Sequence, residues 1–261
     1  TAIFCTLLRM ARLPNVINMD GIEWQRAKWG AGPKAWFYLN EWAGAWLGNH
    51  LVADHPEIKV HLSRRTSPER ITVIPYGAED IRSADTAPVT ALGLEPGRYL
   101  SVIARAEPEN SLLEIVEGFS RKPRGMKLAV LGKYEDSNAY HQAVKAAAGN
   151  EVMFLGAIYD KKVVQALRFH SAAYVHGHQV GGTNPSLVEA LGAGNAVIAH
   201  DNRFNRWVAG PGAAFFDGAA GFATQLDAIL ADPTRLDSMR KASRERFLAE
   251  FQWEKILSEY E

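Results

Sequence analysis

The stretch 176–200 contains the residues whose types and spacing are best suited to chemistry. It reads HGHQVGGTNPSLVEALGAGNAVIAH, in which two glycines and a threonine separate an apolar run from an amphipathic segment. Asn184 is a typical N-cap residue and Pro185 suits the first helical turn, so we predict that a helix begins here. Backbone N–H groups and the helix dipole at such a start bind phosphate or sugar hydroxyls. The residues of this predicted anion site are Gly181, Gly182, Thr183, Asn184 and Ser186.

Glu189 lies one helical turn further along the same predicted helix. A carboxylate at this position is placed to accept hydrogen bonds from a diol such as that of ribose. The alternative is an ordinary connection from strand to helix, with no ligand.

A second candidate anion site lies in the stretch 101–110, SVIARAEPEN. Arg105 directly follows an apolar run of strand length. A guanidinium there can bind a diphosphate through two parallel hydrogen bonds, and it is permanently charged. Alternatively, Arg105 forms an ion pair on the surface.

The elements that must position these residues alternate in type. Amphipathic segments with apolar residues three and four apart, the helical period, separate short apolar runs. This rhythm predicts parallel strands joined by helices in a doubly wound sheet, whose ligands bind at the carboxyl ends of the strands. The six predicted strands are 98–104, 126–132, 151–156, 172–176, 195–200 and 213–216.

The region before residue 77 has a different character. It contains one credible strand, 16–19, and a predicted long helix from about Pro33 to Ala53. Proline and glycine follow the apolar run in 71–80, which places a domain border near Tyr76. Five of the seven tryptophans lie in this region. The predicted helix has one apolar face that we expect in a core, formed by Trp36, Leu39, Ala43 and Trp46, while the loop 24–29, WQRAKW, is the better functional candidate.

Composition excludes several classes of protein. Lys and Arg total 29 and Asp and Glu total 29, so the zero net charge gives no reason to expect nucleic-acid binding. The single cysteine, Cys5, excludes an internal disulfide framework and a cysteine zinc site, and it fits a reducing compartment such as the cytosol. No apolar run has the ~18 residues needed to cross a bilayer.

Together these motifs resemble the GT-B-fold retaining glycosyltransferases, the large group that includes bacterial polysaccharide and glycogen synthases. Arg105 matches the arginine of that group and Glu189 the second of its two glutamates. Asn110 stands where a lysine is expected, and Gly181 stands where the first glutamate is expected. The segments 18–29, 104–110, 176–190 and 201–208 resemble one branch, the bacterial rhamnosyltransferases that build cell-wall and capsular polysaccharides.

The resemblance implies an α/β fold of GT-B type. Its complete C-terminal Rossmann-like domain, residues 78–250, would bind the nucleotide sugar. Residues 1–77 would form part of an N-terminal Rossmann-like lobe on the acceptor side, and 251–261 would start the helix that returns to it. Compared with such enzymes, we expect the chain to lack roughly 100 residues of the first lobe.

The activity implied is transfer of L-rhamnose from a dTDP-linked donor to a cell-surface polysaccharide or lipid-linked acceptor. Retention of configuration and independence of metals and other cofactors are implied as well. Asp20 stands where many relatives carry a histidine near the reacting carbon, although a strand-end aspartate can also simply cap a loop. We expect the segment 154–160 to enclose the base. The predicted acceptor residues are Glu23, Trp24, Arg26 and Lys28.

The sequence is also compatible with two other functions. One is a nucleotide-binding module without catalysis, because the lysine and one glutamate are replaced. The other is a metal-dependent hydrolase, because His176 and His178 share one face of a strand and His200 and Asp201 follow the next strand. We expect a cytoplasmic protein, and a peripheral contact with the inner face of the plasma membrane stays open.

Overall fold

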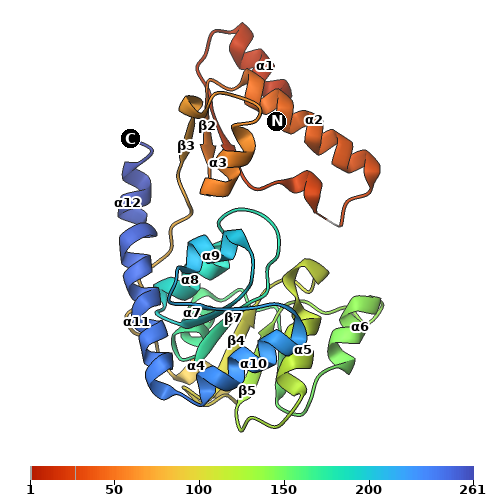
Figure 1. Cartoon of the computed structure of the whole chain (residues 1–261), viewed down its shortest axis with the longest axis vertical. Helices are drawn as coiled ribbons and strands as arrows, with labels where there is room; N and C mark the ends of the chain where they lie inside the picture. The colour runs from red at the N-terminus through yellow and green to blue at the C-terminus, as the bar shows by residue number, and fades with distance from the viewer. Residues whose placement is uncertain (1, 27) are drawn as a thin grey trace. The chain divides into compact units, whose positions relative to one another are not determined.

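The computed structural model describes residues 2–26 and 28–261 (Figure 1). Thr1 and Ala27, which belong to the predicted first lobe and to the predicted loop 24–29, lie outside the described residues. The chain forms two compact units. The first contains the residues up to Tyr76 together with Val180–Asn184 and Glu254–Glu261, and the second contains Gly77–Gln179 and Pro185–Trp253.

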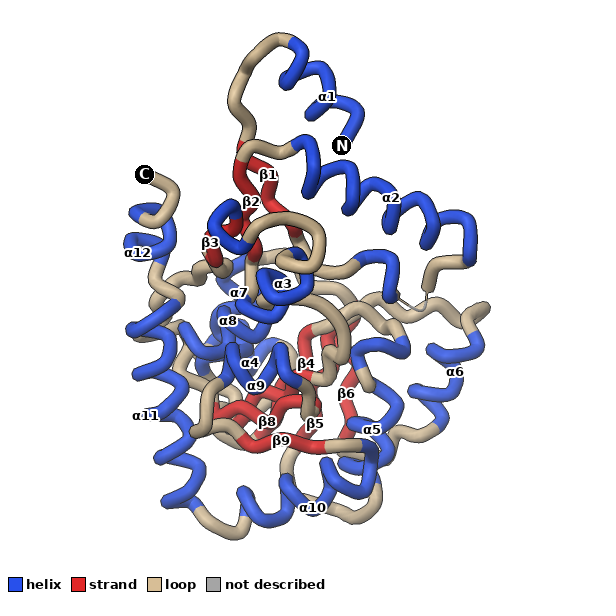
Figure 2. The backbone as a smooth tube through the Cα atoms, turned by 45° about the horizontal axis from the view of Figure 1, so that its top comes forward, coloured by secondary structure: helices blue, strands red, loops and turns tan. Residues whose placement is uncertain are grey.

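The second unit is built on a six-stranded parallel sheet, drawn in red among the blue helices in Figure 2. All six strands predicted for it are confirmed. Their order in the sheet is β6-β5-β4-β7-β8-β9, so the direction of winding reverses between β4 and β7. Ligands of doubly wound sheets bind at such a reversal. The strands are β4 Tyr99–Ile103, β5 Lys127–Leu131, β6 Val152–Gly156, β7 Ala173–His176, β8 Ala196–His200 and β9 Ala214–Phe216.

Helices connect these strands, and several begin at a side chain that caps them. Asn138, Asp160, Asn202 and Asp232 each accept a hydrogen bond from a backbone N–H of the first helical turn. The helices are α4 Ala87–Ala91, η3 Pro108–Asn110, α5 Leu112–Ser120, α6 Ala139–Ala146, α7 Lys161–Phe169, α8 Pro185–Gly192, α9 Arg203–Ala209, α10 Gly218–Leu230 and α11 Pro233–Glu250. A twelfth α-helix, α12 Trp253–Ser258, comes next.

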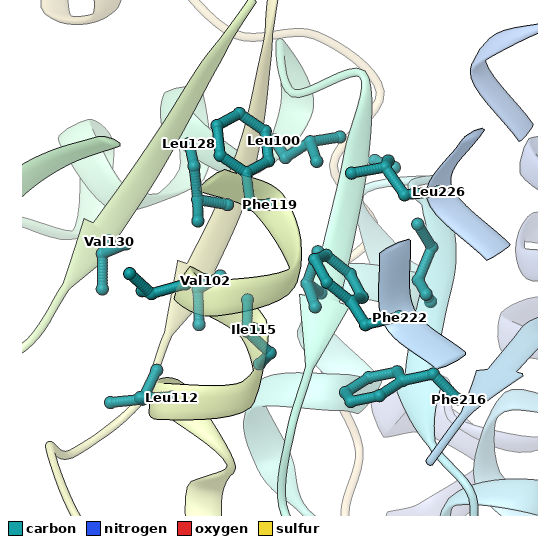
Figure 3. Packing of buried hydrophobic residues seen from close by; sticks show 14 of the residues in the cluster. Leu100, Val102, Leu112, Ile115, Phe119, Leu128, Val130, Phe216, Phe222 and Leu226 are labelled. Atoms are coloured by element: carbon teal, nitrogen blue, oxygen red, sulfur yellow. The ribbon is translucent and has the colours of Figure 1, made fainter. Parts of the chain in front are cut away.

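Both faces of this sheet are buried, because alternate residues of each strand point to opposite sides. Leu100 and Val102 of β4 pack with α5 and α10, as Figure 3 shows for Phe119 and Phe222. Tyr99 points to the other face, into a cluster with residues of α4 and α7. Burying a side chain of this size contributes about 1.5–3 kcal/mol. The sheet therefore forms a well-packed platform for the loops at its carboxyl edge.

The first unit contains a three-stranded parallel sheet of order β1-β2-β3. The predicted helix from Pro33 to Ala53 is wrong in its second part, because α2 ends at Leu47 and β2 comes after it. Gly48 and Asn49 separate the two, and glycine or asparagine is a common helix stop. The elements are α1 Ala2–Met10, β1 Val16–Met19, η1 Glu23–Gln25, α2 Ala31–Leu47, β2 His50–Ala53, α3 Pro56–Leu62, η2 Pro68–Arg70 and β3 Ile71–Val73.

The face of α2 that we expected in a core is exposed. The exposed fractions are 61% for Trp36, 62% for Leu39 and 74% for Trp46. The buried residues of α2 are instead Glu41, Gly44 and Ala45. Small residues let the helix approach the sheet closely, and α2 carries apolar residues on more than one face, so periodicity alone could not identify the packed one.

No helix among the described residues has both the length and the apolar character that crossing a membrane requires.

Candidate functional site

Arg105 and Asn110 lie in the loop that follows β4, beside the segment that follows β7. The Asn110 side chain is buried, and its Nδ2 donates to the carbonyl of Arg105 at 2.9 Å. Its Oδ1 is therefore an acceptor and lies 2.7 Å from Nδ1 of His178, so that this ring nitrogen carries the proton. Asn110 thus orders both Arg105 and His178, while the Arg105 side chain itself is exposed.

The two loops are joined by further hydrogen bonds. The Ser111 hydroxyl donates to the carbonyl of Gly177, and the N–H of Gln179 donates to the carbonyl of Glu109, at 2.8 and 2.9 Å. A Cβ on Gly177 would overlap the carbonyl of Asn110, so only glycine fits this close approach. The carboxyl ends of β4 and β7 therefore form one ordered edge.

The predicted motif 201–208 also supports this edge. Asn202 and Asn205 both donate through Nδ2 to the carbonyl of His178, at 3.0 and 2.8 Å. The Asp201 carboxylate forms an ion pair with Arg206 through two hydrogen bonds, of 2.6 and 2.7 Å. The asparagines thus position the backbone after β7.

Of the two histidines proposed as a metal pair, His176 is buried and His178 is partly buried. Burial, followed by the neighbouring His178 and His200, lowers the pKa of His176 well below its ordinary value. Burial also lowers the pKa of His200, whose ring packs edge-on against Phe216. No group of three or more histidine, cysteine, aspartate or glutamate side chains that could hold a metal ion occurs in residues 2–26 and 28–261.

A cavity of about 460 Å³ lies in the second unit and contains Glu189 in its wall. Oε2 of Glu189 lies 2.5 Å from Nη2 of Arg168, a buried guanidinium on α7. The same nitrogen donates to the hydroxyl oxygen of Ser186 at 3.0 Å. Arg168 therefore holds α8 and its glutamate in place. The cavity is also lined by Ile103, Ile158, Tyr159, Gln165 and Trp253.

The Ser186 side chain is part of a buried network. Its hydroxyl lies 2.8 Å from the Tyr174 hydroxyl, and both lie within 3.3 Å of the carbonyl of Ile103. Burial raises the pKa of Tyr174, which stays protonated. The predicted role of Ser186 in phosphate binding therefore depends on its backbone N–H, since the hydroxyl is used within the protein.

The segment 154–160, predicted to enclose a base, contributes Ile158 and Tyr159 to this cavity. Across it, Gln165 donates through Nε2 to Oε2 of Glu79 at 2.6 Å, and Lys161 forms an ion pair with the other oxygen. Apolar walls with a few oriented polar groups are typical of sites for small molecules.

The loop Val180–Asn184 belongs to the first unit. The Thr183 N–H donates to Oδ2 of Asp54 at 2.8 Å, and the Thr183 hydroxyl donates to the Asp54 carbonyl. This corrects the prediction of Thr183 as a direct donor to phosphate, because its N–H already has an acceptor. Gly181 has a φ of +105°, a value that favours glycine.

Asp20 follows β1 and is exposed, and it accepts a hydrogen bond from Tyr76. Burial and then Asp20 and Asp54 raise the pKa of Tyr76 to about 12. Burial also raises the pKa of Asp54 to about 7, and the charge of Asp20 adds to this, against the opposing hydrogen bond from Thr183. Two carboxyl groups and a phenol therefore interact at the strand ends of the first unit.

The four predicted acceptor residues are only partly brought together around a cavity. Glu23 and Trp24 line a cavity of about 160 Å³, whereas Arg26 and Lys28 bind Glu23 instead, at 3.0 and 3.4 Å. Although burial raises the pKa of Glu23, hydrogen bonds from Trp29 and Arg26 leave it below its ordinary value. Glu23 is thus an ionised group held by its own loop.

Trp24 is oriented by a residue that sequence reasoning missed. Its Nε1 donates to Oε2 of Glu41, a buried carboxylate whose Oε1 lies 2.6 Å from Nε2 of His61 and also pairs with Arg65. The other missed residues, Asn18 and Asn40, line the same cavity. A carboxylate within a helix of aromatic residues was the available signal for Glu41.

Residues 92–246, more than half of the chain, match the sequence profile of the family described as glycosyl transferases group 1. The chain belongs to this family. Among solved structures, the group 1 glycosyltransferase is similar to sucrose-phosphate synthase from Thermosynechococcus elongatus, with a TM-score of 0.83 and 18% identity over 99% of this chain and 70% of that one.

Other solved structures are also similar to this chain. HepE of Anabaena, solved with UDP, gives a TM-score of 0.83 at 14% identity, over 99% of this chain and 74% of that one. TarM of S. aureus gives a TM-score of 0.74 at 14% identity, over 98% of this chain and 52% of that one. No curated protein matches the sequence. The structural matches show the fold, which is α/β and of GT-B type with a Rossmann-like domain, as the sequence predicts.

Proposed function

We propose that this glycosyltransferase takes L-rhamnose from a dTDP-linked donor and adds it to a cell-surface polysaccharide or lipid-linked acceptor. The observation that carries the donor half is the cavity of about 460 Å³ in which Arg168 orients Glu189. Structures with the same fold support a nucleotide-sugar donor, since HepE was solved with UDP-glucose and TarM with UDP. The sugar and the base are inferred from the resemblance of the motifs to rhamnosyltransferases.

The nucleoside would occupy this cavity, with its base against Ile158 and Tyr159. Arg168 engages one oxygen of Glu189, so the other oxygen is available to accept a hydrogen bond from the sugar. A ribose would donate two hydroxyl groups here, whereas the deoxyribose of dTDP would donate only its 3′-hydroxyl. Glu189 is thus proposed to orient the nucleoside.

Negative charge develops on the leaving diphosphate as the glycosidic bond breaks. The protein lowers the reaction barrier by stabilising this charge. We assign this task to the exposed guanidinium of Arg105, whose backbone Asn110 fixes, and to N–H groups at the start of α8. Loss of one such donor typically costs about 10²–10³ in rate. The amides of Gly181, Gly182 and Asn184 stay predictions from the sequence. Arg105 would supply the positive charge without a metal ion.

Retention of configuration requires the acceptor hydroxyl to attack from the side of the leaving group. A phosphate oxygen of the donor would accept the proton of that hydroxyl. Asp20, which accepts a hydrogen bond from Tyr76 and lies near the buried Asp54, is proposed to position the reacting sugar. Its substitution by alanine tests this assignment, since near-normal turnover would remove Asp20 from the mechanism.

The acceptor would bind in the smaller cavity of the first unit. Trp24, held by Glu41, offers an apolar face, while Asn18 and Asn40 offer hydrogen-bonding groups of the kind that recognise sugars. Glu23 lines this cavity as well, and Arg26 and Lys28 are proposed to act by holding Glu23. A peripheral contact with the inner face of the plasma membrane stays a prediction.

One observation favours a second candidate, a nucleotide-binding module without catalysis. The structure uses both side-chain polar groups of Asn110, the residue in place of the expected lysine, in hydrogen bonds within the protein. The cavity would then bind a nucleotide without transfer of its sugar.

A transfer assay separates the two candidates. The protein is incubated with dTDP-L-rhamnose and membranes or lipid-linked oligosaccharide, and NMR records the configuration of the new glycosidic bond. We expect a retained configuration and a rate that falls about 10²-fold in Arg105→Ala but is unchanged in Arg121→Ala, an exposed arginine after α5. Nucleotide binding with no transfer by the wild-type protein would favour the second candidate.

A further inference from the structure

The carboxyl group of Asp54 is placed against the loop Val180–Asn184. Asp54 directly follows β2 and is 1% exposed. Its Oδ2 accepts from the Thr183 N–H at 2.8 Å, and its backbone carbonyl accepts from the Thr183 hydroxyl. Thr183 is itself 2% exposed, so both hydrogen bonds are shielded from water. These contacts join residues that are 129 positions apart in the sequence.

The loop backbone is shaped to fit this carboxyl group. A Cβ on Gly182 would overlap both carboxyl oxygens of Asp54, so only glycine permits the approach. Gly21 lies near the same loop, since a Cβ there would be at ordinary contact distance from Cα of Gly181, at 3.8 Å, and from N of Gly182, at 3.9 Å. The strand ends of the first unit therefore determine the course of the chain through Gly181, Gly182 and Thr183.

The loop continues directly into α8. Asn184 comes directly after Thr183, and the first residue of α8 is Pro185. The backbone N–H groups before and within the first turn of α8 are those that the proposed function assigns to the donor diphosphate. Without an acceptor in Asp54, the Thr183 N–H would be buried without a partner, and the loop would have to change conformation to reach water.

We propose that Asp54 is a positioning residue for glycosyl transfer, holding in one conformation the backbone of Gly181 and Gly182, whose N–H groups the proposed function assigns to the donor diphosphate. This inference rests on the proposed function and adds a residue that touches neither substrate. It requires an acceptor oxygen for the Thr183 N–H, which an asparagine side chain also supplies. Asparagine should therefore replace Asp54, whereas alanine should not.

The test uses the full chain in four forms: wild type, Asp54→Asn, Asp54→Ala and Thr183→Val. Hydrogen–deuterium exchange of a peptide spanning residues 180–184 reports the loop directly. Asp54→Ala should exchange about tenfold faster there, and Asp54→Asn should exchange like wild type. Thr183→Val removes only the hydroxyl and should give an intermediate rate, which preserves the test if Asp54→Ala does not fold. Asp232→Ala, which removes the cap of α11, is the matched control and should leave the peptide unchanged.

Kinetics distinguish positioning from a purely structural role. With active sites counted by nucleotide titration, Asp54→Ala should lower kcat about tenfold at unchanged acceptor KM, and Asp54→Asn should restore kcat. Unchanged loop exchange in Asp54→Ala, or an asparagine variant as impaired as the alanine variant, would overturn the inference. If wild type transfers no sugar, the proposed function fails, while the exchange data still decide whether Asp54 holds the loop.

Discussion

The guanidinium of Arg168 and the carboxylate of Glu189 form an ion pair, 2.5 Å from Nη2 to Oε2, in which the arginine is buried and the glutamate is half exposed. The pair connects α7 to α8 across the wall of the larger cavity. One glutamate oxygen is thereby fixed, and the proposed function assigns the other to the ligand. Arg168 also donates to Ser186, so one buried group orders two residues of the predicted donor site.

The variant Arg168→Ala tests this arrangement. It leaves Glu189 without its ion-pair partner and removes one hydrogen bond to Ser186, so we expect nucleotide affinity to fall about tenfold and stability to fall by about 1–2 kcal/mol. Calorimetric titration and urea unfolding measure the two effects. The matched control is Arg206→Ala, which breaks an exposed pair with Asp201 and should change neither quantity appreciably. Equal effects of the two variants would contradict the role of Arg168.

Gly182→Ala should disturb the loop through Asp54. The added Cβ overlaps the Asp54 carboxyl group, so we expect a stability loss of about 1–3 kcal/mol and faster exchange of residues 180–184. Combining it with Asp54→Ala removes the overlap, so the double variant should lose less than the sum of the single losses in urea unfolding. Gly221→Ala in α10, where a Cβ would meet nothing within 4 Å, should be neutral or stabilising. Strictly additive losses would show that Gly182 and Asp54 do not touch.

The stability of the protein should depend on pH through Asp54. Its folded pKa is raised to about 7, above the ordinary value near 4, so the folded state binds more protons between these values. Wild type should therefore lose stability relative to Asp54→Asn as pH rises from about 4 to about 7, by roughly 1–4 kcal/mol, and the difference should then level off. The ionisable groups facing Asp54 are Asp20, Tyr76 and Tyr260.

Urea unfolding of the two proteins side by side measures this difference. The histidines with lowered pKa, His176 and His200, act in the opposite sense, because their contribution is lost as pH falls. They are present in both proteins and cancel in the comparison. A difference that is flat between about pH 4 and pH 8 would show that Asp54 is ionised in the folded protein.

Trp24 should affect the acceptor and not the donor. Trp24→Ala removes the aromatic wall of the smaller cavity and leaves Glu41 without one of its donors, so we expect acceptor KM to rise about tenfold. Donor KM should be unchanged. Trp36→Ala, a tryptophan that is exposed on α2, is the matched control and should leave both constants unchanged. A rise in donor KM for Trp24→Ala would contradict the assignment of this cavity to the acceptor.

The larger sheet could be predicted from the sequence because each strand is a short apolar run between helical segments. The helix predicted over 33–53 is wrong at its end, because the apolar residues of its last segment, HLVA, continue the pattern beyond the stop at Gly48 and Asn49. That error also concealed Asp54. Directly after a predicted helix it looks unremarkable, whereas an aspartate directly after a buried parallel strand is a candidate site residue.

Other parts of the site depend on contacts between distant residues. The pairs Asp54 with Thr183 and Trp24 with Glu41 have no signature in local spacing, and the sequence therefore assigned the Thr183 N–H to a ligand. Similarly, the apolar residues of α2 did not reveal which face packs, since the choice was made by small residues opposite β1. Arg105 and Glu189 stay predictions, which were possible because both residues belong to local motifs.

The proposed binding of the donor nucleotide by the second unit, at Glu189 and Arg105, is tested most directly by calorimetric titration. Wild type, Arg105→Ala, Glu189→Gln and the control Glu117→Gln, an exposed glutamate on α5, are titrated with dTDP, UDP, GDP and ADP. We expect preferential binding of dTDP, about tenfold or more weaker in the first two variants and unchanged in the control. Wild-type affinity for dTDP in both Arg105→Ala and Glu189→Gln would contradict this assignment of the donor site.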